Sequence, residues 1–171
     1  KSVSITPDGL EVDFSTSTND YTIKGSKIVF AIPTTILKTI KVHPAFTKEK
    51  SKSIQNQSYG HVMKIAMQFQ KRFWDSNNSI GQRVFTDTPL RRIYHFSIDQ
   101  PGPRGILLSF TSGDDARKLG KLPHQSRMKI AKQTCNEIWS QSDKYWENGI
   151  SKYWNDDMWT KASYSLKGIG Q

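Results

Sequence analysis

The sequence predicts an α+β fold in which a mixed, largely antiparallel β-sheet packs against two or three helices. Short apolar runs, alternating or continuous, recur through residues 1–111 and are separated by turn residues. A 3.6-residue apolar periodicity follows between residues 123 and 141, and the 171-residue length is enough for one domain with a hydrophobic core. The sequence shows no internal repeat or low-complexity tract.

Residues 1–32 are expected to form strands joined by turns. VSITPDGLEVDF places two alternating runs around residues 7–9, where proline fixes φ and glycine accepts a positive φ, so it predicts a hairpin. YTIKGSKIVFAI repeats the pattern around Gly25. Its continuously apolar part, residues 28–32, is typical of a strand buried on both faces.

The middle of the chain is expected to hold the remaining long strands. TTILKTIKV predicts a turn and short helix after Pro33, and TKEKSKSIQNQS predicts a short exposed helix or loop. DQPGPRG is a turn because no regular element tolerates two prolines and two glycines in seven residues. Strands are expected over residues 63–73, 82–86, 92–97 and 105–111.

The last third is expected to begin with helices. Asp114 and Asp115 follow Gly113, and an aspartate there can cap free backbone N–H groups at a helix start. A longer helix is predicted from residue 123 to about residue 141, with one apolar stripe. Two short strands are expected in the aromatic-rich segment that follows.

The charge of the chain suits a polyanion partner but does not require one. The net charge is +10, with 25 Lys and Arg against 15 Asp and Glu, and the pI is near 9.7. The basic residues are scattered, with short clusters at 48–52, 71–72 and 91–92. Such scatter favours solvated lysines over a nucleic-acid arm.

The expected location is the cytoplasm. Cys135 is the single cysteine, so no internal disulfide can form and nothing points to an oxidising compartment. No apolar run approaches the roughly 18 residues that a membrane span requires. The chain opens on Lys1 without an apolar signal segment, which suggests processing or excision from a longer protein.

Several standard sites are absent from the sequence. It contains no CxxC pair, no HExxH and no GxxxxGK, and its four histidines lack metal-ligand spacing, so no metal is predicted. The pairs at 114–115 and 156–157 are read as structural, because adjacent side chains on a strand point to opposite sides. GIG at 168–170 is read as a turn.

Tryptophans offer an alternative function. Trp139, Trp146, Trp154 and Trp159 could, with the positive charge, form a base-stacking surface in a nucleic-acid-binding module. Such binding would weaken steeply with salt. Packing in the core is the favoured interpretation, because large rings usually serve it.

Lys64 stands out within MKIAMQF. Period-2 alternation places Met63 and Ile65 on one face of the strand and Lys64 on the other. The pattern alone indicates a solvated residue on the polar face of an edge strand.

Five stretches, taken in order, carry a resemblance to a known family. They are KIVFAIPTTILKTIKVHPAF, YGHVMKIAMQFQKRFW, TDTPLRRIYHF, GILLSFTSGDDARKL and YWNDDMWTKASYS. Their order and spacing over residues 27–171 resemble the flavin-containing amine oxidases, and within them the L-amino-acid oxidases and tryptophan 2-monooxygenases. The resemblance implies an oxidoreductase that moves a hydride equivalent from the carbon bearing the amine to flavin, giving an imine.

The resemblance also implies a fragment. Family members are several times longer and carry a GxGxxG turn for the FAD pyrophosphate, which this sequence lacks. Residues 1–46 would then be strands and hairpins at the edge of the FAD-binding domain, and residues 47–171 the substrate-binding domain. The fragment alone is expected to be inactive, to bind the remaining FAD-binding segments, and to self-associate through exposed apolar surface.

Site residues follow from the resemblance one position at a time. Lys64 would face the flavin and hold a water near its reactive N5, as a catalytic and cofactor-binding residue. Tyr94 matches a pocket-lining aromatic, Ser112 a side-chain-pocket position, and Tyr164 an aromatic that flanks the substrate. Ser163 falls where some monoamine oxidases carry the cysteine that bonds FAD, so FAD is expected to be held noncovalently.

Phe110 leaves the substrate open. In the amino-acid oxidases this position usually holds a tyrosine that binds the substrate carboxylate. A buried carboxylate that lacks one such hydrogen bond loses roughly 1.5–3 kcal/mol. An amine without a carboxylate therefore competes with an amino acid as the expected substrate.

Overall fold

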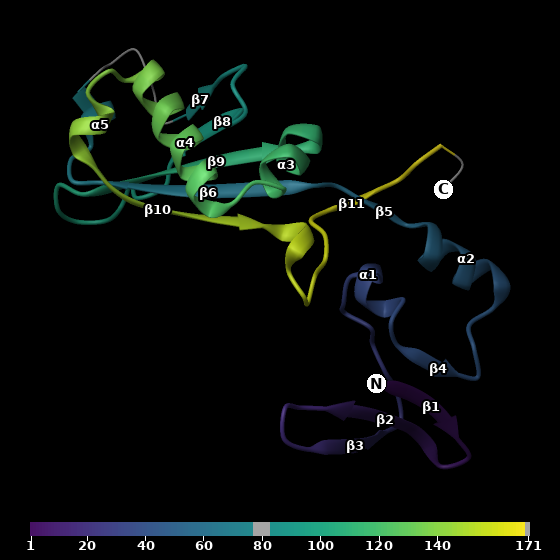
Figure 1. Ribbon diagram of the computed structural model, residues 1–171. Helices are drawn as coiled ribbons and strands as arrows, with labels where there is room; N and C mark the ends of the chain where they lie inside the picture. The colour runs from purple at the N-terminus through teal and green to yellow at the C-terminus, as the bar shows by residue number, and fades with distance from the viewer. Residues whose placement is uncertain (77–82, 170–171) are drawn as a thin grey trace. The chain divides into compact units, whose positions relative to one another are not determined.

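The computed structural model describes residues 1–76 and 83–169, which form two compact units. One unit comprises Lys1–Tyr59 and Asp157–Gln171, and the other Gly60–Asp156. Figure 1 shows the elements of each unit. The sequence predicted a different boundary, between an FAD-binding part up to residue 46 and a substrate-binding part from residue 47. That boundary concerns function, which the two compact units do not test, so it stays a prediction.

The first unit is built on a four-stranded sheet in the order β3-β2-β1-β4. Its first three strands are antiparallel, and β4 joins β1 in parallel. The predicted hairpin is confirmed: Gly9, with a φ of 132°, begins the second strand, and an added Cβ would lie 2.7 Å from the Gly25 carbonyl oxygen. The strands are β1 (Ser2–Thr6), β2 (Gly9–Ser15), β3 (Asp20–Gly25) and β4 (Lys41–His43).

The predicted buried strand over residues 28–32 is wrong. The segment has no regular secondary structure, and Val29 is 86% exposed. A strand buried on both faces needs neighbouring strands and covering layers, and none pairs with this segment in the described part of the chain. Continuous apolar character predicted burial that these residues do not have.

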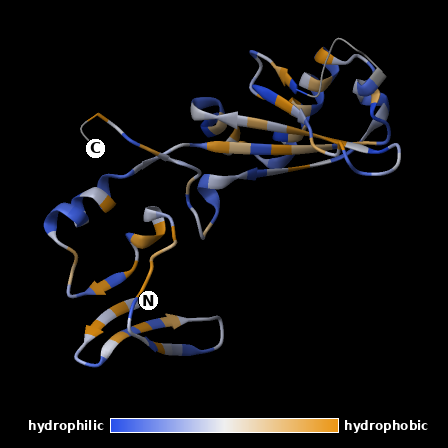
Figure 2. Cartoon of the chain, turned by 180° about the vertical axis from the view of Figure 1, so that it is seen from behind, coloured by the Kyte–Doolittle hydropathy of each residue, from blue (hydrophilic) through white to orange (hydrophobic). Residues whose placement is uncertain are grey.

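Two short helices and a small strand pair complete the first unit. The predicted helix after Pro33 and the exposed helix within TKEKSKSIQNQS are both present, and the second is largely hydrophilic (Figure 2). Thr47 caps that helix by accepting a hydrogen bond from the Lys50 N–H at 3.3 Å. The elements are α1 (Thr34–Leu37), α2 (Lys48–Asn56), β5 (Ser58–Tyr59) and β11 (Ser165–Leu166).

The second unit is built on a five-stranded antiparallel sheet in the order β10-β6-β9-β8-β7. The predicted strand from residue 63 ends at Phe69, and Phe73–Ser76 is a 3₁₀ turn, η1. Gln82, in another predicted strand, lies outside the described residues. The strands are β6 (Val62–Phe69), β7 (Arg83–Phe85), β8 (Arg92–His95), β9 (Gly105–Ser112) and β10 (Trp146–Tyr153).

Helices cover one face of this sheet, as predicted. Figure 1 shows α3 (Gly113–Gly120) and α4 (His124–Ile138) on one side of β6, β9 and β10. A short helix, α5 (Ser142–Tyr145), leads into β10, and a 3₁₀ turn, η2 (Trp154–Asp156), follows it. No helix in the two described ranges is long and apolar enough to cross a membrane.

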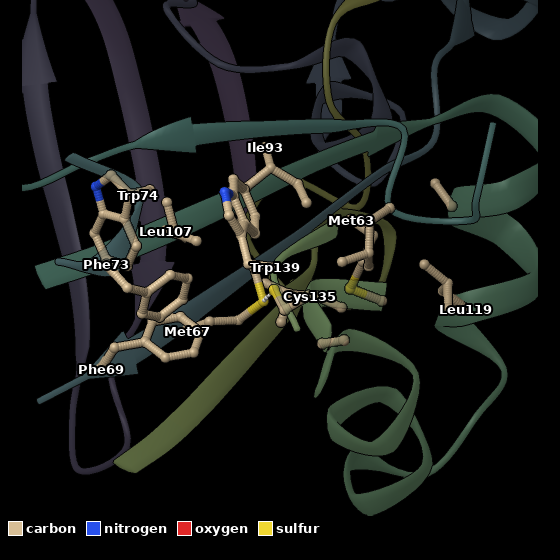
Figure 3. Close-up of a cluster of buried hydrophobic side chains, with 14 residues drawn as sticks. Met63, Met67, Phe69, Phe73, Trp74, Ile93, Leu107, Leu119, Cys135 and Trp139 are labelled. Atoms are coloured by element: carbon tan, nitrogen blue, oxygen red, sulfur yellow. Dashed lines mark hydrogen bonds between the residues drawn. The ribbon is translucent and has the colours of Figure 1, made fainter. Parts of the chain in front are cut away.

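The core lies between the sheet and these helices. Met63, Met67 and Phe69 of β6 are fully buried, as the alternation predicted. Figure 3 shows them in one cluster with Trp139 and Cys135, which lie near Met67. Aromatic rings meet edge to face at one end, where the Phe69 centroid lies 5.5 Å from that of Trp146. Because these alternate residues of β6 face the helices, the side chains between them, including Lys64, point to the opposite side of the sheet.

The aspartates of α3 do not cap it. The N-cap residue is Ser112, which makes no side-chain cap bond, and the aspartates lie in the first turn. Asp114 accepts from Arg117 at 3.0 Å, and Asp115 from the Arg91 Nε–H at 2.5 Å. Negative charge in this first turn still suits the positive end of the helix dipole.

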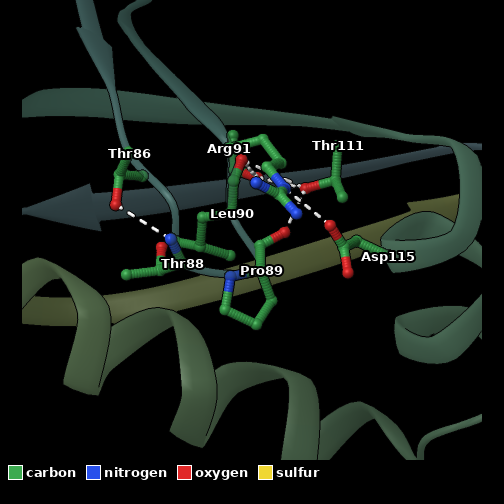
Figure 4. Close-up of polar contacts among 8 residues, drawn as sticks. Thr86, Thr88, Pro89, Leu90, Arg91, Thr111 and Asp115 are labelled. Carbon is green, nitrogen blue, oxygen red and sulfur yellow. Dashed lines mark hydrogen bonds and ion pairs between the residues drawn. The ribbon is translucent and has the colours of Figure 1, made fainter.

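A turn before β8 is tied to β9 (Figure 4). Leu90 is buried, and its carbonyl oxygen accepts from Ser109 Oγ at 3.3 Å and Thr111 Oγ1 at 3.1 Å. Arg91, at a φ of 58°, is held by its ion pair with Asp115. These bonds fix the start of β8, and therefore its position beside β9.

Gly120→Ala is expected to destabilise the second unit by about 1–3 kcal/mol, the usual cost of overpacking. An added Cβ would lie 2.5 Å from Tyr153 Cε1, and the ring is held by a 2.5 Å hydrogen bond between Tyr153 Oη and His61 Nδ1. Chemical denaturation measures the loss. In a Tyr153→Leu background the same methyl group should cost less, and an equal cost in both backgrounds would contradict the clash.

Candidate functional site

The side chains of the five-stranded sheet that point away from α3 and α4 form its open face. No described α-helix of this unit packs on this face. Its apolar members are partly or largely exposed: Phe85 is 71% and Ile150 69% exposed. The register places these residues on the open face: Arg83, Phe85, Arg92, Tyr94, Lys64, Ala66, Gln68, Ile106, Leu108, Phe110, Ser112, Asn148, Ile150 and Lys152.

Lys64 occupies the middle of this face. Its strand, β6, lies between β9 and β10, so the interpretation of an edge-strand residue is wrong. Phe110 is its partner in β9 and Lys152 its partner in β10, so the three form one row across the sheet. The Lys64 Nζ atom lies 5.6 Å from the centroid of the Phe110 ring.

Tyr94 and Ser112 share the open face with Lys64. Tyr94 is opposite Leu108 in the register, and the Arg83 guanidinium carbon lies 5.7 Å from its ring centroid. Ser112 follows Phe110 by two residues at the end of β9. The four predicted site residues of this unit, Lys64, Tyr94, Phe110 and Ser112, therefore lie on one surface.

Sequence reasoning missed the polar end of the open face. Glu147 Oε2 accepts from Gln68 Nε2 at 3.0 Å, and Glu147 Oε1 accepts from Arg104 Nε at 2.9 Å. These two hydrogen bonds lower the pKa of Glu147. Beside them is a hollow of about 120 Å³, lined by Ala66, Gln68, Ile106, Asn148, Gly149 and Ile150. No local signal could have found this cluster, because it depends on the pairing of β10 with β6.

The family is decided by comparison with known proteins. The model of the flavin containing amine oxidoreductase family matches residues 1–171. The chain belongs to this family. The predicted α+β class is confirmed by similar solved structures. A putrescine oxidase structure superposes on this chain with a TM-score of 0.82 at 18% identity, over 96% of this chain and 36% of that one. Cyclohexylamine oxidase from Brevibacterium oxydans gives 0.81 at 13% identity, over 95% and 35%.

The chain is also similar in sequence to proteins that are named as oxidases. The putative L-amino-acid oxidase YobN of Bacillus subtilis is 29% identical over 82% of this chain and 30% of its own length. The flavin-dependent L-tryptophan oxidase RebO of Lentzea aerocolonigenes is 24% identical over 83% and 31%. The chain spans about a third of the length of these relatives.

Two predicted site residues lie in the first unit. Ser163 and Tyr164 follow the buried Ala162, and Tyr164 is 46% exposed. That Ser163 contacts the flavin and Tyr164 the substrate stays a prediction.

The single thiol of the chain is poorly placed for covalent chemistry. Cys135 is buried in α4, with its Sγ atom 3.5 Å from Met67 Sδ. Burial raises the pKa of this thiol to about 12, so it stays protonated at neutral pH. Cys135 therefore serves the core and offers no bond to a flavin.

The tryptophans that could form a base-stacking surface divide between the core and the surface. Trp139 is buried and Trp146 packs against the core, which confirms the packing interpretation for both. For Trp159 the packing interpretation is wrong, because its side chain is 60% exposed, with the Lys1 Nζ atom 4.8 Å from its ring centroid. Across the described ranges, no group of three or more His, Cys, Asp or Glu side chains could hold a metal ion.

His61 and Tyr153 form a neutral pair next to the row that contains Lys64. Burial lowers the pKa of His61 and raises the pKa of Tyr153. Both groups are therefore uncharged at neutral pH, and their hydrogen bond locks Tyr153 against Gly120.

Proposed function

We propose that this chain forms the substrate-binding wall of an FAD-dependent amine or L-amino-acid oxidase, related to the tryptophan 2-monooxygenases. The observation that carries the proposal is the position of Lys64: its ammonium group lies on the open face, next to Phe110 and in the same surface as Tyr94. Family membership supplies the reaction class, and the open face supplies a surface for a flat cofactor and an apolar substrate.

The residues present fit a flavin. A planar aromatic ring system suits the flat, partly exposed apolar surface around Leu108 and Phe110. Lys64 and Ser163 are the residues proposed to contact it, and the buried Cys135 supports noncovalent binding. When bound, FAD supplies the acceptor for the hydride equivalent that leaves the carbon bearing the amine.

Each residue of the wall has a proposed task. The Lys64 ammonium donates a hydrogen bond to a water and holds it in place. Tyr94 and Tyr164 present rings that exclude bulk water and orient the substrate. Ser112 lines the side-chain pocket and, being small, leaves room for a substrate side chain, while Phe110 contributes apolar surface without a donor.

Anaerobic mixing of the flavin-loaded holoenzyme with amines and amino acids tests this proposal. We expect the flavin absorbance to bleach with at least one of L-tryptophan, L-phenylalanine and their decarboxylated amines. Oxygen from ¹⁸O₂ appearing in the product would identify the monooxygenase outcome, and its absence the oxidase outcome. A holoenzyme that no amine or amino acid reduces would contradict the proposed function.

The isolated chain provides a second arm of this test. We expect it to bind FAD weakly and to show no oxidase activity, because a phosphate-binding glycine turn is missing from the sequence. Turnover by residues 1–171 alone would contradict this expectation.

A further inference from the structure

A register shift in β10 brings one extra side chain to the polar end of the open face. Between Trp146 and Asn148 the pairing with β6 slips, so Glu147 has no partner of its own in the register. Its carboxylate accepts hydrogen bonds from Gln68 Nε2 at 3.0 Å and from Arg104 Nε at 2.9 Å. Shifts of this kind re-aim a side chain and are common beside active sites.

The Glu147 carboxylate fixes which end of the Gln68 amide meets the hollow. The hydrogen bonds from Gln68 and Arg104 lower the pKa of Glu147, so this group is ionised at neutral pH and only accepts hydrogen bonds. Gln68 must therefore present its NH₂ group to Glu147, which leaves its Oε1 atom as an acceptor. Gln68 lines the hollow, and within residues 1–76 and 83–169 no residue donates a hydrogen bond to this oxygen.

The hollow offers a donor beside this acceptor. Asn148 Oδ1 accepts a hydrogen bond from the Gly149 N–H at 2.8 Å, so its Nδ2 group is left to donate elsewhere. The other lining side chains, those of Ala66, Ile106 and Ile150, are apolar. Apolar walls with a few placed polar groups are typical of sites that fix the orientation of a small ligand group.

The hollow extends along β6 in the direction of Lys64. Ala66 lies between Gln68 and Lys64 on the open face, and its register partners are the larger Leu108 in β9 and Ile150 in β10. The short side chain of Ala66 therefore leaves this row lower in the middle than at its sides. Gln68 and Lys64 are four residues apart, which is about 13 Å along a strand.

We propose that the hollow is a distal subsite that binds the far end of the substrate, a neutral group that carries a hydrogen-bond donor, such as a hydroxyl. This inference rests on the proposed function, which puts the amine near Lys64, and it deepens that function by naming a substrate class. Gln68 Oε1 accepts from the far-end group, and Glu147 is a positioning residue that holds the Gln68 amide. Because Arg104 already neutralises Glu147, the subsite offers no free carboxylate to a second ammonium group.

The dimensions of the open face set the length of this substrate. Of the 13 Å between Lys64 and Gln68, a polar contact of about 3 Å at each end leaves roughly 7 Å for the substrate. An extended chain advances about 1.2 Å per bond, so about six bonds separate the carbon bearing the amine from the far-end oxygen. A cavity of about 150 Å³ holds benzene, so the hollow of about 120 Å³ accepts the end of a chain and not a second ring system.

Gln68→Met in the flavin-loaded holoenzyme tests the subsite with 6-amino-1-hexanol and hexylamine, which differ only in the far-end hydroxyl. We expect the wild-type enzyme to favour the amino alcohol about fivefold in kcat/KM, the scale of one net hydrogen bond. In Gln68→Met this preference should vanish, while kcat/KM for hexylamine stays within about twofold because methionine keeps the length of the side chain. For an enzyme that requires a carboxylate, 2-aminoheptanoate and its 7-hydroxy derivative form the equivalent pair.

Three controls accompany this variant. The shorter pair, 3-amino-1-propanol and propylamine, cannot reach Gln68 and should show no preference in either enzyme. Glu147→Gln allows the Gln68 amide to turn, because a glutamine donates as well as accepts, so the preference should fall while kcat/KM for hexylamine is kept. Gln133→Met should change neither substrate: Gln133 makes the same kind of bond, from its Nε2 to Glu137 Oε1 at 3.0 Å, but lies on α4.

The outcomes separate the two proposals. If the wild-type enzyme oxidises amines or amino acids without favouring the hydroxyl of the longer pair, or if Gln68→Met keeps that preference, the distal subsite is wrong and the proposed function stands. Oxidation of the shorter pair but not of the longer pair would overturn the subsite in the same way. If no amine or amino acid reduces the flavin, the proposed function is wrong and the subsite falls with it.

Discussion

Lys64→Met in the flavin-loaded enzyme is expected to slow reoxidation of the reduced flavin by oxygen about a hundredfold, the scale of a lost proton-handling group. Methionine keeps the length and apolar stem of the side chain but removes its charge and its three donors. The water held by the ammonium group would lose its anchor. Stopped-flow mixing of the anaerobically reduced enzyme with oxygenated buffer measures the rate.

The structure provides a matched control for this variant. Lys129→Met makes the same change on the exposed side of α4 and should leave reoxidation unchanged. The fold should survive Lys64→Met, because the side chain is only partly buried and lies against Phe110. An unaltered reoxidation rate in Lys64→Met would remove this residue from the oxygen reaction.

Phe69→Ala is expected to cost about 3–5 kcal/mol of unfolding free energy, the usual range for a buried phenylalanine. Phe69 is fully buried, and its ring lies edge to face with Phe73 at 5.1 Å, Trp74 at 5.6 Å and Trp146 at 5.5 Å between centroids. Removing the ring leaves a cavity and breaks three aromatic contacts. Denaturant titration followed by tryptophan fluorescence measures the loss.

Phe85→Ala is the control, because it removes the same ring from a residue that is 71% exposed. We expect the free energy of unfolding to change by less than about 0.5 kcal/mol, as for most surface substitutions. Equal losses in the two variants would mean that the aromatic cluster around Phe69 does not stabilise this unit.

Local signals predicted most of the fold. The hairpin around Gly9 requires a positive φ that glycine supplies, and the stripe of α4 has a helical period, so both could be found in short windows. The segment 28–32 was assigned wrongly because apolar character reports a preference for burial, not the presence of a partner strand. β4 was missed and β10 was predicted too short, because each is defined by pairing with a distant strand.

Local signals and the family resemblance also predicted part of the candidate site. Alternation alone placed Lys64 opposite the core stripe of β6, which the structure confirms. The family resemblance named Tyr94, Phe110 and Ser112, and these positions share the open face. Neither the alternation pattern nor the family resemblance indicated Lys152. It comes close to Lys64 only when β10, which is distant in the sequence, pairs with β6.

That strand order has a consequence for biosynthesis. β6 pairs with β9 on one side, but the segment that pairs with its other side, β10, is synthesised only after β9, α3 and α4. Until then β6 presents an unsatisfied edge with a strongly apolar face, the kind of surface that chaperones recognise and that aggregates if left uncovered. Early termination within residues 146–153 should therefore produce an insoluble product rather than a smaller folded one.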